Sequence, residues 1–355
     1  MTAKEGKMEI SRIYKYRNIW MGFAICWVVF YHLTLPIEEN TVGIAISLVK
    51  QIGYGGVDIF FMASGTGCFF SYEKNRNTYD FLKRRCKRIL PTYLLIVIIW
   101  QIYVWGKGEF DFLGCMGMLF GVSNLTVTGG GISWYITAMW ISYLLTPIFV
   151  DMVKNANGIK KDIVNILFIV LLTIPFWNTP LAIISITRLP VFYIGMLMAR
   201  EGSAYKTISA KAIIYSIVLS IVGIIMLFFF KSQYEDLILW NYGLYWYPFI
   251  LITPGLCIGI SLFAGWLEKF KFGRCINKVT EILGNNTFEI FLVHIVLSDI
   301  FGRLRNQDII TDLWIGNTVL VIITIVISYL LCLLRKGMLK IIDNPSGMFA
   351  FGQKS

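Results

Sequence analysis

Long apolar runs separated by short polar segments make up most of the chain. A bilayer core needs about 20 apolar residues per helix, and on that criterion the hydrophobic pattern predicts membrane-spanning helices. The ten expected spans are 18–35, 55–72, 88–105, 132–152, 162–178, 181–199, 211–230, 243–265, 282–301 and 313–334. The polar segments between them are too short for a second, soluble domain. The pattern therefore predicts an all-α membrane protein, a single bundle of about ten transmembrane helices.

The basic residues predict how this bundle is oriented, because cytoplasmic loops of membrane proteins carry an excess of lysine and arginine. With the N-terminus in the cytoplasm, the inner segments hold 26 of the 32 Lys and Arg residues. The outer segments hold only Lys50, Lys107, Lys231, Arg303 and Arg305. We therefore expect both termini in the cytoplasm. The predicted parts are a cytoplasmic segment 1–17, a membrane domain 18–334 and a cytoplasmic tail 335–355.

The segment 110–122 is apolar enough to resemble an eleventh span. Counting it would move every later basic loop to the outside, so we interpret it as interfacial or re-entrant. No small-residue cleavage site follows the first apolar run, and no cleavable signal peptide is therefore expected.

Composition and charge narrow the function classes. Hydrophobic residues make up 57% of the 355 positions and charged residues 15%, whereas soluble domains have roughly 45–50% and about 25%. These values exclude a soluble globular domain and a disordered chain. The net charge of +11 is explained by the inner loops, so nucleic acid is not an expected partner. The seven cysteines show neither a disulfide framework nor a zinc-binding spacing, and no metal is expected.

Ionisable residues inside the apolar runs are the candidate functional residues, since such a residue is costly to insert, about 2.5–3.5 kcal/mol for arginine or aspartate. They are His32, Asp58, Arg188, Glu289 and His294. Four fall in the outer parts of their spans, at depths compatible with one polar pocket, whereas Glu289 lies deeper and on a different helix face from His294. The alternatives are structural, because a buried histidine can bond across a helix interface and an aspartate can cap a helix.

Six local sequences surround or accompany these residues. They are MGFAICWVVFYH (21–32), GYGGVDIFFMASG (53–65), FLKRRCKRILPTY (81–93), SWYITAMWISYLLTP (133–147), RLPVFYIGMLMAR (188–200) and NTFEIFLVH (286–294). Their order and spacing resemble the integral-membrane acyltransferases of the type-3 family, best known for O-acetylating bacterial surface polysaccharides and peptidoglycan. The resemblance extends from about residue 12 to residue 335.

The resemblance implies a cytoplasmic donor, acetyl-CoA or another acyl-CoA, and an acceptor hydroxyl outside the membrane. The family's essential first-span histidine corresponds to His32. A neutral imidazole can take a proton from the attacking hydroxyl or accept the acyl group itself, and the sequence leaves both roles open. Asp58 matches the family's aspartate, which either orients an imidazole or caps its helix. His294 is the last residue of the last motif. It either faces the same cavity or only packs against neighbouring helices.

Arg85 and Arg88 lie three residues apart, on one helix face at the cytoplasmic end of their span. The resemblance implies that this face meets the phosphates of the donor, which a guanidinium fork fits. Alternatively, both arginines serve only as topology signals. Arg188 is a candidate to hold a developing oxyanion or an acidic group of the substrate. Ser64 and Ser133 are weaker candidates, because small hydroxyl residues commonly pack between membrane helices.

One position departs from the family pattern. Arginine or lysine usually stands eleven residues before the first-span histidine, where this chain has Met21. Arg17 lies one turn earlier, about 6 Å along the helix axis at 1.5 Å per residue. Arg17 or a basic residue of another span could supply the charge; otherwise the mechanism differs or activity is reduced.

The expected function is a membrane O-acyltransferase of the plasma membrane, with acetyl as the expected group and a cell-envelope glycan as the acceptor. It would belong to the acyltransferases that transfer groups other than aminoacyl groups. Two other classes stay open. One is a transporter or flippase of an envelope precursor, although no internal repeat is visible. The other is a family member that binds coenzyme A but has weakened or lost chemistry.

Overall fold

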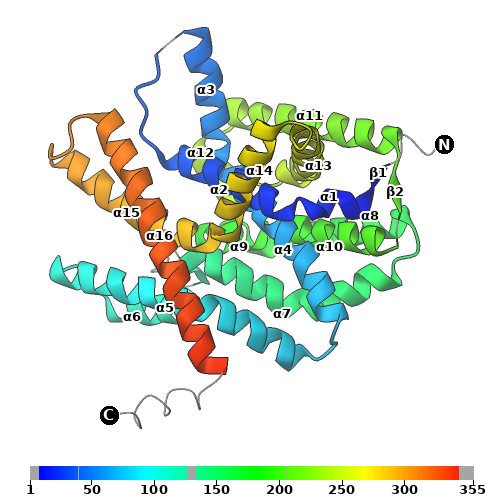
Figure 1. The fold of residues 1–355 in the computed structure, drawn as a ribbon, viewed down its shortest axis with the longest axis horizontal. Helices are drawn as coiled ribbons and strands as arrows, with labels where there is room; N and C mark the ends of the chain where they lie inside the picture. Colours follow the sequence, from blue (N-terminus) through cyan, green and yellow to red (C-terminus); the bar gives the residue numbers. More distant parts are fainter. Residues whose placement is uncertain (1–7, 39, 126–132, 205, 344–355) are drawn as a thin grey trace.

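The computed structural model describes residues 8–38, 40–125, 133–204 and 206–343, which form an almost entirely helical bundle (Figure 1). The helices are α1 (Ile10–Lys15), α2 (Arg17–His32), α3 (Thr41–Gln51), α4 (Gly56–Glu73), α5 (Thr78–Gly106), α6 (Phe112–Leu119), α7 (Ser133–Asn155), α8 (Ile159–Leu171), α9 (Pro180–Ile186), α10 (Leu189–Ser203), α11 (Ala210–Gln233), α12 (Asp236–Asn241), α13 (Phe249–Leu267), α14 (Lys271–Asn285), α15 (Thr287–Asn306) and α16 (Leu313–Asp343). Single 3-10 turns occur at Gly53–Gly55, Ser123–Leu125 and Ile174–Phe176. Strands β1 (Met8–Glu9) and β2 (Thr207–Ile208) form one antiparallel pair.

Seven helical stretches among the described residues are long and apolar enough to cross a membrane. They are Thr41–Glu73, Thr78–Gly106, Ser133–Asn155, Ala182–Ser203, Ala210–Gln233, Phe249–Leu267 and Leu313–Lys340. The all-α membrane architecture predicted from the sequence is therefore confirmed. Each of the ten predicted spans overlaps at least one helix, but α2 and α8 have only 16 and 13 residues. The number of ten spans and the cytoplasmic position of both termini stay predictions.

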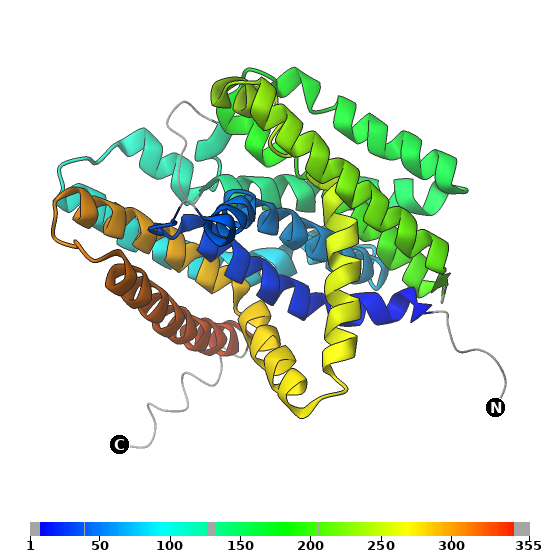
Figure 2. The same ribbon diagram turned by 90° about the horizontal axis from the view of Figure 1, so that it is seen from above.

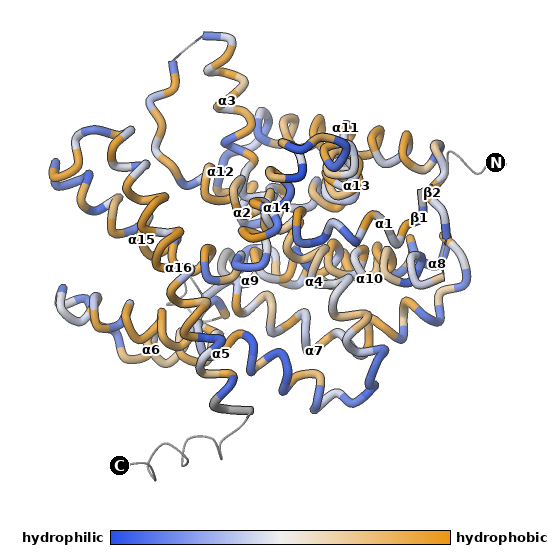
Figure 3. Tube along the Cα trace, viewed as in Figure 1, coloured by the Kyte–Doolittle hydropathy of each residue, from blue (hydrophilic) through white to orange (hydrophobic). Residues whose placement is uncertain are grey.

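The lipid-facing helices show why the chain needs a bilayer. Helix α11 buries only Gly223 and Leu227 and exposes a series of large aliphatic side chains, among them Ile214, Val218 and Ile225. Figure 3 shows that hydrophobic positions dominate α11 and much of α16, while hydrophilic positions gather in the connections. Such an apolar exterior suits a lipid environment.

Several predicted spans differ from the observed helices. The span predicted over 282–301 is divided at Asn286, between α14 and α15, and the span predicted over 243–265 is helical only from Phe249. The span predicted over 181–199 is interrupted, because α9 ends at Ile186 and α10 begins at Leu189. Arg188 therefore stands at the N-terminal end of α10, and Pro190 follows in the first turn, where proline is tolerated. The span predicted over 162–178 is shorter, since α8 ends at Leu171.

Five helices lie wholly or mostly outside the predicted spans, and the shortest of them, α1 and α12, have six residues each. Helix α6 falls within 110–122 and has eight residues, about 12 Å at 1.5 Å per residue, too short to cross a bilayer. Helix α3 occupies part of the predicted outer segment 36–54, and α14 occupies the predicted inner segment 266–281.

Close packing of α4 against α10 positions the polar residues in the middle of the bundle, where both views place α2 and α4 (Figures 1 and 2). A Cβ atom at Gly65 would collide with the carbonyl oxygen of Phe192, and one at Gly195 with that of Met62. Small residues let membrane helices approach this closely. The hydroxyl of Thr66 also donates to the carbonyl oxygen of Gly195 at 3.1 Å. This contact brings the start of α4 beside the start of α10.

Candidate active site

A cavity of about 700 Å³ lies at the end of α2 that we predict to face outward. His32 and Arg188 line it, together with two lysines, Lys50 and Lys231. Its other lining residues include a group of large aromatic side chains, Tyr31, Tyr54, Trp134, Trp240, Tyr245, Trp246 and Phe291. The cavity therefore combines an apolar, aromatic wall with a few polar groups, which is typical of a small-molecule site.

The two histidines of the chain meet at this cavity. His32 is the last residue of α2, and the centroid of its ring lies 5.1 Å from that of His294 in α15. Nδ1 of His32 lies 2.9 Å from the carbonyl oxygen of Val28, and Nδ1 of His294 lies 3.0 Å from that of Ile290. A carbonyl oxygen only accepts, so each Nδ1 carries the hydrogen, and the lone pair of each neutral ring is on Nε2. His32 thus brings a basic nitrogen to the cavity.

His294 is completely buried, and its Nε2 has no hydrogen-bond partner among the described residues. Its ring also contacts Phe291, with the centroids 5.4 Å apart. His294 therefore packs against the His32 ring from the buried side of the cavity wall.

Asp58 and Arg188 form a buried ion pair, with Oδ2 and Nη1 2.5 Å apart and side-chain exposures of 0% and 1%. The guanidinium of Arg188 also lies 5.7 Å from the ring centroid of Trp134 and 5.4 Å from that of Trp246. Asp58 was expected to orient an imidazole or cap its helix; in the structure its hydrogen-bonded partner is Arg188. The reason is geometric, because the packing of α4 on α10 places the two charges together.

A second, narrower cavity of about 50 Å³ lies at the opposite end of α2. Four arginines line it, Arg17, Arg85, Arg88 and Arg335. The lining also contains one carboxylate, Glu289, whose Oε1 lies 2.7 Å from Nε of Arg335. The site is strongly cationic, and it gathers both arginines predicted to meet the donor.

Arg17, one of the residues expected to supply the charge absent at Met21, lies close to that position in space. Met21 and Arg17 both line this second cavity. We call it the inner cavity, because it lies at the end of α2 that we predict to face the cytoplasm, and we call the cavity that His32 lines the outer cavity. Arg17 donates to the carbonyl oxygen of Ala63 at 3.4 Å, and Arg85 donates to that of Gly67 at 3.3 Å. Arg17 therefore brings a guanidinium into the cavity that Met21 also reaches, without occupying its position in the sequence.

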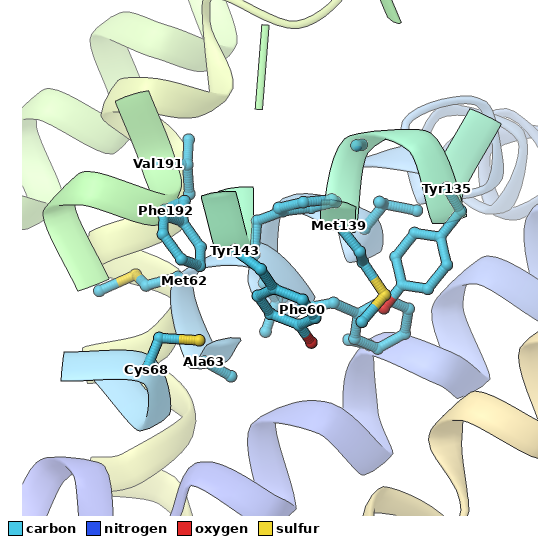
Figure 4. Packing of buried hydrophobic residues seen from close by; sticks show 14 of the residues in the cluster. Phe60, Met62, Ala63, Cys68, Tyr135, Met139, Tyr143, Val191 and Phe192 are labelled. Atoms are coloured by element: carbon cyan, nitrogen blue, oxygen red, sulfur yellow. The ribbon is translucent and has the colours of Figure 1, made fainter. Parts of the chain in front are cut away.

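Aromatic rings separate the two cavities. Tyr135 lines the inner cavity and Phe291 the outer one, and their ring centroids are 4.4 Å apart. Phe60 lies 6.3 Å from Tyr135 and 6.4 Å from Phe291. All three are at most 5% exposed. Figure 4 shows Phe60, Tyr135 and Met139 in this packed region. Because Phe291 touches His294, the histidine pair lies next to the ring layer.

The remaining candidates fall on both sides of this layer. Ser64 lines the inner cavity, while the buried Ser133 accepts a hydrogen bond from the Ser123 hydroxyl. Sequence reasoning treated Arg335, Lys50 and Lys231 only as topological charges, and no motif marked them as cavity residues. Among the described residues, no group of three His, Cys, Asp or Glu side chains could hold a metal ion.

Two cavities and a buried ion pair within a bundle of long apolar helices define a membrane protein with a polar interior. The sequence model described as an acyltransferase domain matches residues 18–333, and the chain belongs to the type-3 acyltransferase family. No curated protein and no solved structure matches the chain. Family membership identifies a multi-pass membrane acyltransferase, which uses an acyl donor and a hydroxylated acceptor.

Proposed function

We propose that the protein is an O-acetyltransferase of the plasma membrane. It moves the acetyl group of cytoplasmic acetyl-CoA to a hydroxyl of a cell-envelope glycan outside the membrane. The observation that carries the proposal is the pair of cavities of different character, cationic and narrow on the predicted inner side, aromatic and wide on the outer. Only a layer of rings beside the two histidines separates them.

The inner cavity suits the phosphates of the donor. Guanidinium groups bind phosphate oxygens in pairs, and four of them against one carboxylate leave a net positive charge. At about 50 Å³ the cavity is narrow, so its side chains have to move apart to admit the arm that carries the acyl group. This narrowness favours a short group such as acetyl.

The chemistry centres on Nε2 of His32. In direct transfer, this nitrogen takes the proton of the glycan hydroxyl while the oxygen attacks the thioester carbonyl, and the coenzyme leaves as a thiolate that takes up the proton. In a relay, Nε2 itself attacks the thioester carbonyl and the coenzyme leaves as a thiolate; the glycan hydroxyl then attacks the acetyl group on Nε2, and its proton passes through the freed imidazole to the thiolate. In both, Arg188 lines the cavity with a positive charge that stabilises the developing oxyanion, held in place by Asp58.

Reconstitution of the purified chain into liposomes tests the proposal. Labelled acetyl-CoA is supplied on one side of the membrane only, and envelope glycans on the other. We expect labelled acetate on the glycan, released by mild base, and none when both compounds are on the glycan side. Exchange of glycan precursors across the membrane without any acyl donor would contradict the proposal and indicate a transporter.

Arg85 and Arg88 provide a prediction about donor binding. The double variant Arg85→Gln/Arg88→Gln removes two of the four guanidinium groups of the inner cavity. Charge-assisted bonds contribute about 1.5–3 kcal/mol each, so we expect the KM for acetyl-CoA to rise at least about tenfold, while kcat falls much less. Steady-state kinetics with varied donor concentration measures both constants.

Arg84 supplies the matched control. It lies on the same helix and is exposed, but it does not line the cavity. Arg84→Gln should leave the KM for the donor within about twofold. An equal rise in KM for Arg84→Gln and the double variant would show that the effect comes from general surface charge.

A further inference from the structure

The outer cavity carries positive charges that the acyl-transfer step does not use. Lys50, in the last turn of α3, and Lys231, in the last turn of α11, both line it. Nζ of Lys50 donates to the carbonyl oxygen of Tyr31 at 3.0 Å, and Nζ of Lys231 donates to Oε1 of Gln51 at 3.5 Å. Through Gln51, the last residue of α3, Lys231 reaches the end of the helix that carries Lys50, and both lysines line the cavity there.

Neither ammonium group is in direct contact with a carboxylate among the described residues, although the negative charge of Asp236 acts on Lys231. Each ammonium also lies near a tyrosine ring, Lys50 near Tyr31 and Lys231 near Tyr245. Arg303, another basic residue of the predicted outer segments, by contrast pairs with Glu109 and Asp299. Each ammonium has three donors and makes only one hydrogen bond in the described part of the chain. Donors therefore remain for a ligand.

The charge balance of the cavity is positive. Arg188 is compensated by Asp58. The one carboxylate that lines the cavity, Asp236, accepts a hydrogen bond from the hydroxyl of Tyr245. Two ammonium groups against this one carboxylate leave an excess positive charge, which attracts an anion.

The two lysines also have a structural explanation, because a cation in the last turn of a helix offsets the helix dipole. The helix dipole does not account for two observations. The bias against basic residues outside the membrane disfavours lysine at both predicted positions. In addition, the dipole does not require lysines of two separate helices to meet at the same cavity.

We propose that the acceptor is an acidic glycan. Its carboxylate or phosphate lies between Lys50 and Lys231, the faces of its sugar rings pack on the aromatic wall, and its reacting hydroxyl lies at His32. A volume of about 700 Å³ falls within the range of small-molecule sites, about 300–1,000 Å³. This inference rests on the proposed function, because it names the substrate class of the same site.

The test is equilibrium binding to the full chain in lipid nanodiscs, with no acyl donor present. The fluorescent probes are a trigalacturonate, its carboxyl-reduced neutral form, and the neutral form carrying one phosphate monoester. We expect at least one acidic probe to bind at least about tenfold more tightly than the neutral form, and this difference to shrink as salt is raised. The tighter of the two acidic probes identifies the anion as carboxylate or phosphate.

Lysine variants assign the effect to the cavity. The double variant Lys50→Gln/Lys231→Gln should bind acidic and neutral probes equally, while Lys50→Arg/Lys231→Arg keeps most of the difference. Lys107→Gln, which removes a predicted outer lysine that does not line the cavity, should behave like the unmodified chain. Equal binding of acidic and neutral probes by the unmodified chain, or an undiminished difference in the double glutamine variant, would overturn the inference.

Because probe binding and acetyl transfer are measured in separate experiments, failure of the inference can be distinguished from failure of the proposed function. A chain that binds acidic probes through the two lysines but transfers no acetyl group would contradict the proposed function and leave the inference standing. A chain that acetylates neutral glycans through His32 and shows no preference for acidic probes would contradict the inference and leave the proposed function standing.

Discussion

Replacement of His32 by alanine is expected to reduce glycan acetylation to the level of a deletion strain. The substitution removes the one imidazole nitrogen that is both unprotonated and placed on the cavity wall. General acid–base catalysis contributes about 10²- to 10⁴-fold, and loss of a covalent carrier removes the reaction path entirely. Base-releasable acetate on purified surface glycans, compared between unmodified, variant and deletion cells, measures the effect.

Cys26→Ala is the matched control for this experiment. Cys26 lies on the same helix α2 and is exposed on the outside of the bundle, so its replacement should leave acetate unchanged. Both variants should insert in the membrane at equal amounts, which immunoblotting of membrane fractions checks. Unchanged acetate in the His32→Ala strain would refute the catalytic role of this residue.

The same variant separates the two roles of the imidazole. If His32 carries the acyl group, the unmodified protein incubated with labelled acetyl-CoA and no acceptor retains label that hydroxylamine releases, and His32→Ala retains none. If His32 acts only as a base, neither protein retains label. The sequence could not distinguish these roles, because both use the same neutral nitrogen.

The hydrophobic pattern was sufficient for the helical architecture, since the bilayer requires long apolar runs wherever the chain crosses it. It was less informative where a helix breaks. The interruption at Arg188 lies inside a continuous apolar run, and only Pro190 marks it in the sequence. Helix α3 was also missed, because hydrophobicity alone does not distinguish an exposed apolar helix between two spans from an apolar loop.

For the site, the energetic cost of charge in lipid identified individual residues, but tertiary packing decided their partners. His32 and His294 are 262 positions apart in the sequence numbering, and no local signal says that their rings touch. The sequence left Asp58 open between acting on an imidazole and capping its helix, whereas the glycine contacts between α4 and α10 bring it to Arg188. The lysines of the outer cavity were missed because a lone lysine outside a span carries no such cost.

The Asp58–Arg188 pair should behave as a single structural unit whose halves cannot be removed separately. Asp58→Asn leaves a buried arginine without its counter-charge, and Arg188→Gln leaves a buried carboxylate. Breaking a buried pair in this way costs about 3–5 kcal/mol. We therefore expect each single variant to lower the thermal stability of the purified protein strongly. The double variant Asp58→Asn/Arg188→Gln should recover most of the loss, because no isolated charge remains.

Activity of the same variants then separates stability from catalysis. Arg303→Gln, which breaks two partly exposed ion pairs, with Glu109 and with Asp299, serves as the control and should cost no more than about 1 kcal/mol for each pair. If Arg188 stabilises the oxyanion, the stable double variant still transfers acetate at least about hundredfold more slowly than the unmodified chain. Recovery of both stability and activity in the double variant would instead assign the pair a purely structural role. Because the ion pair is buried and Arg188 also lines the cavity, we expect recovery of stability alone.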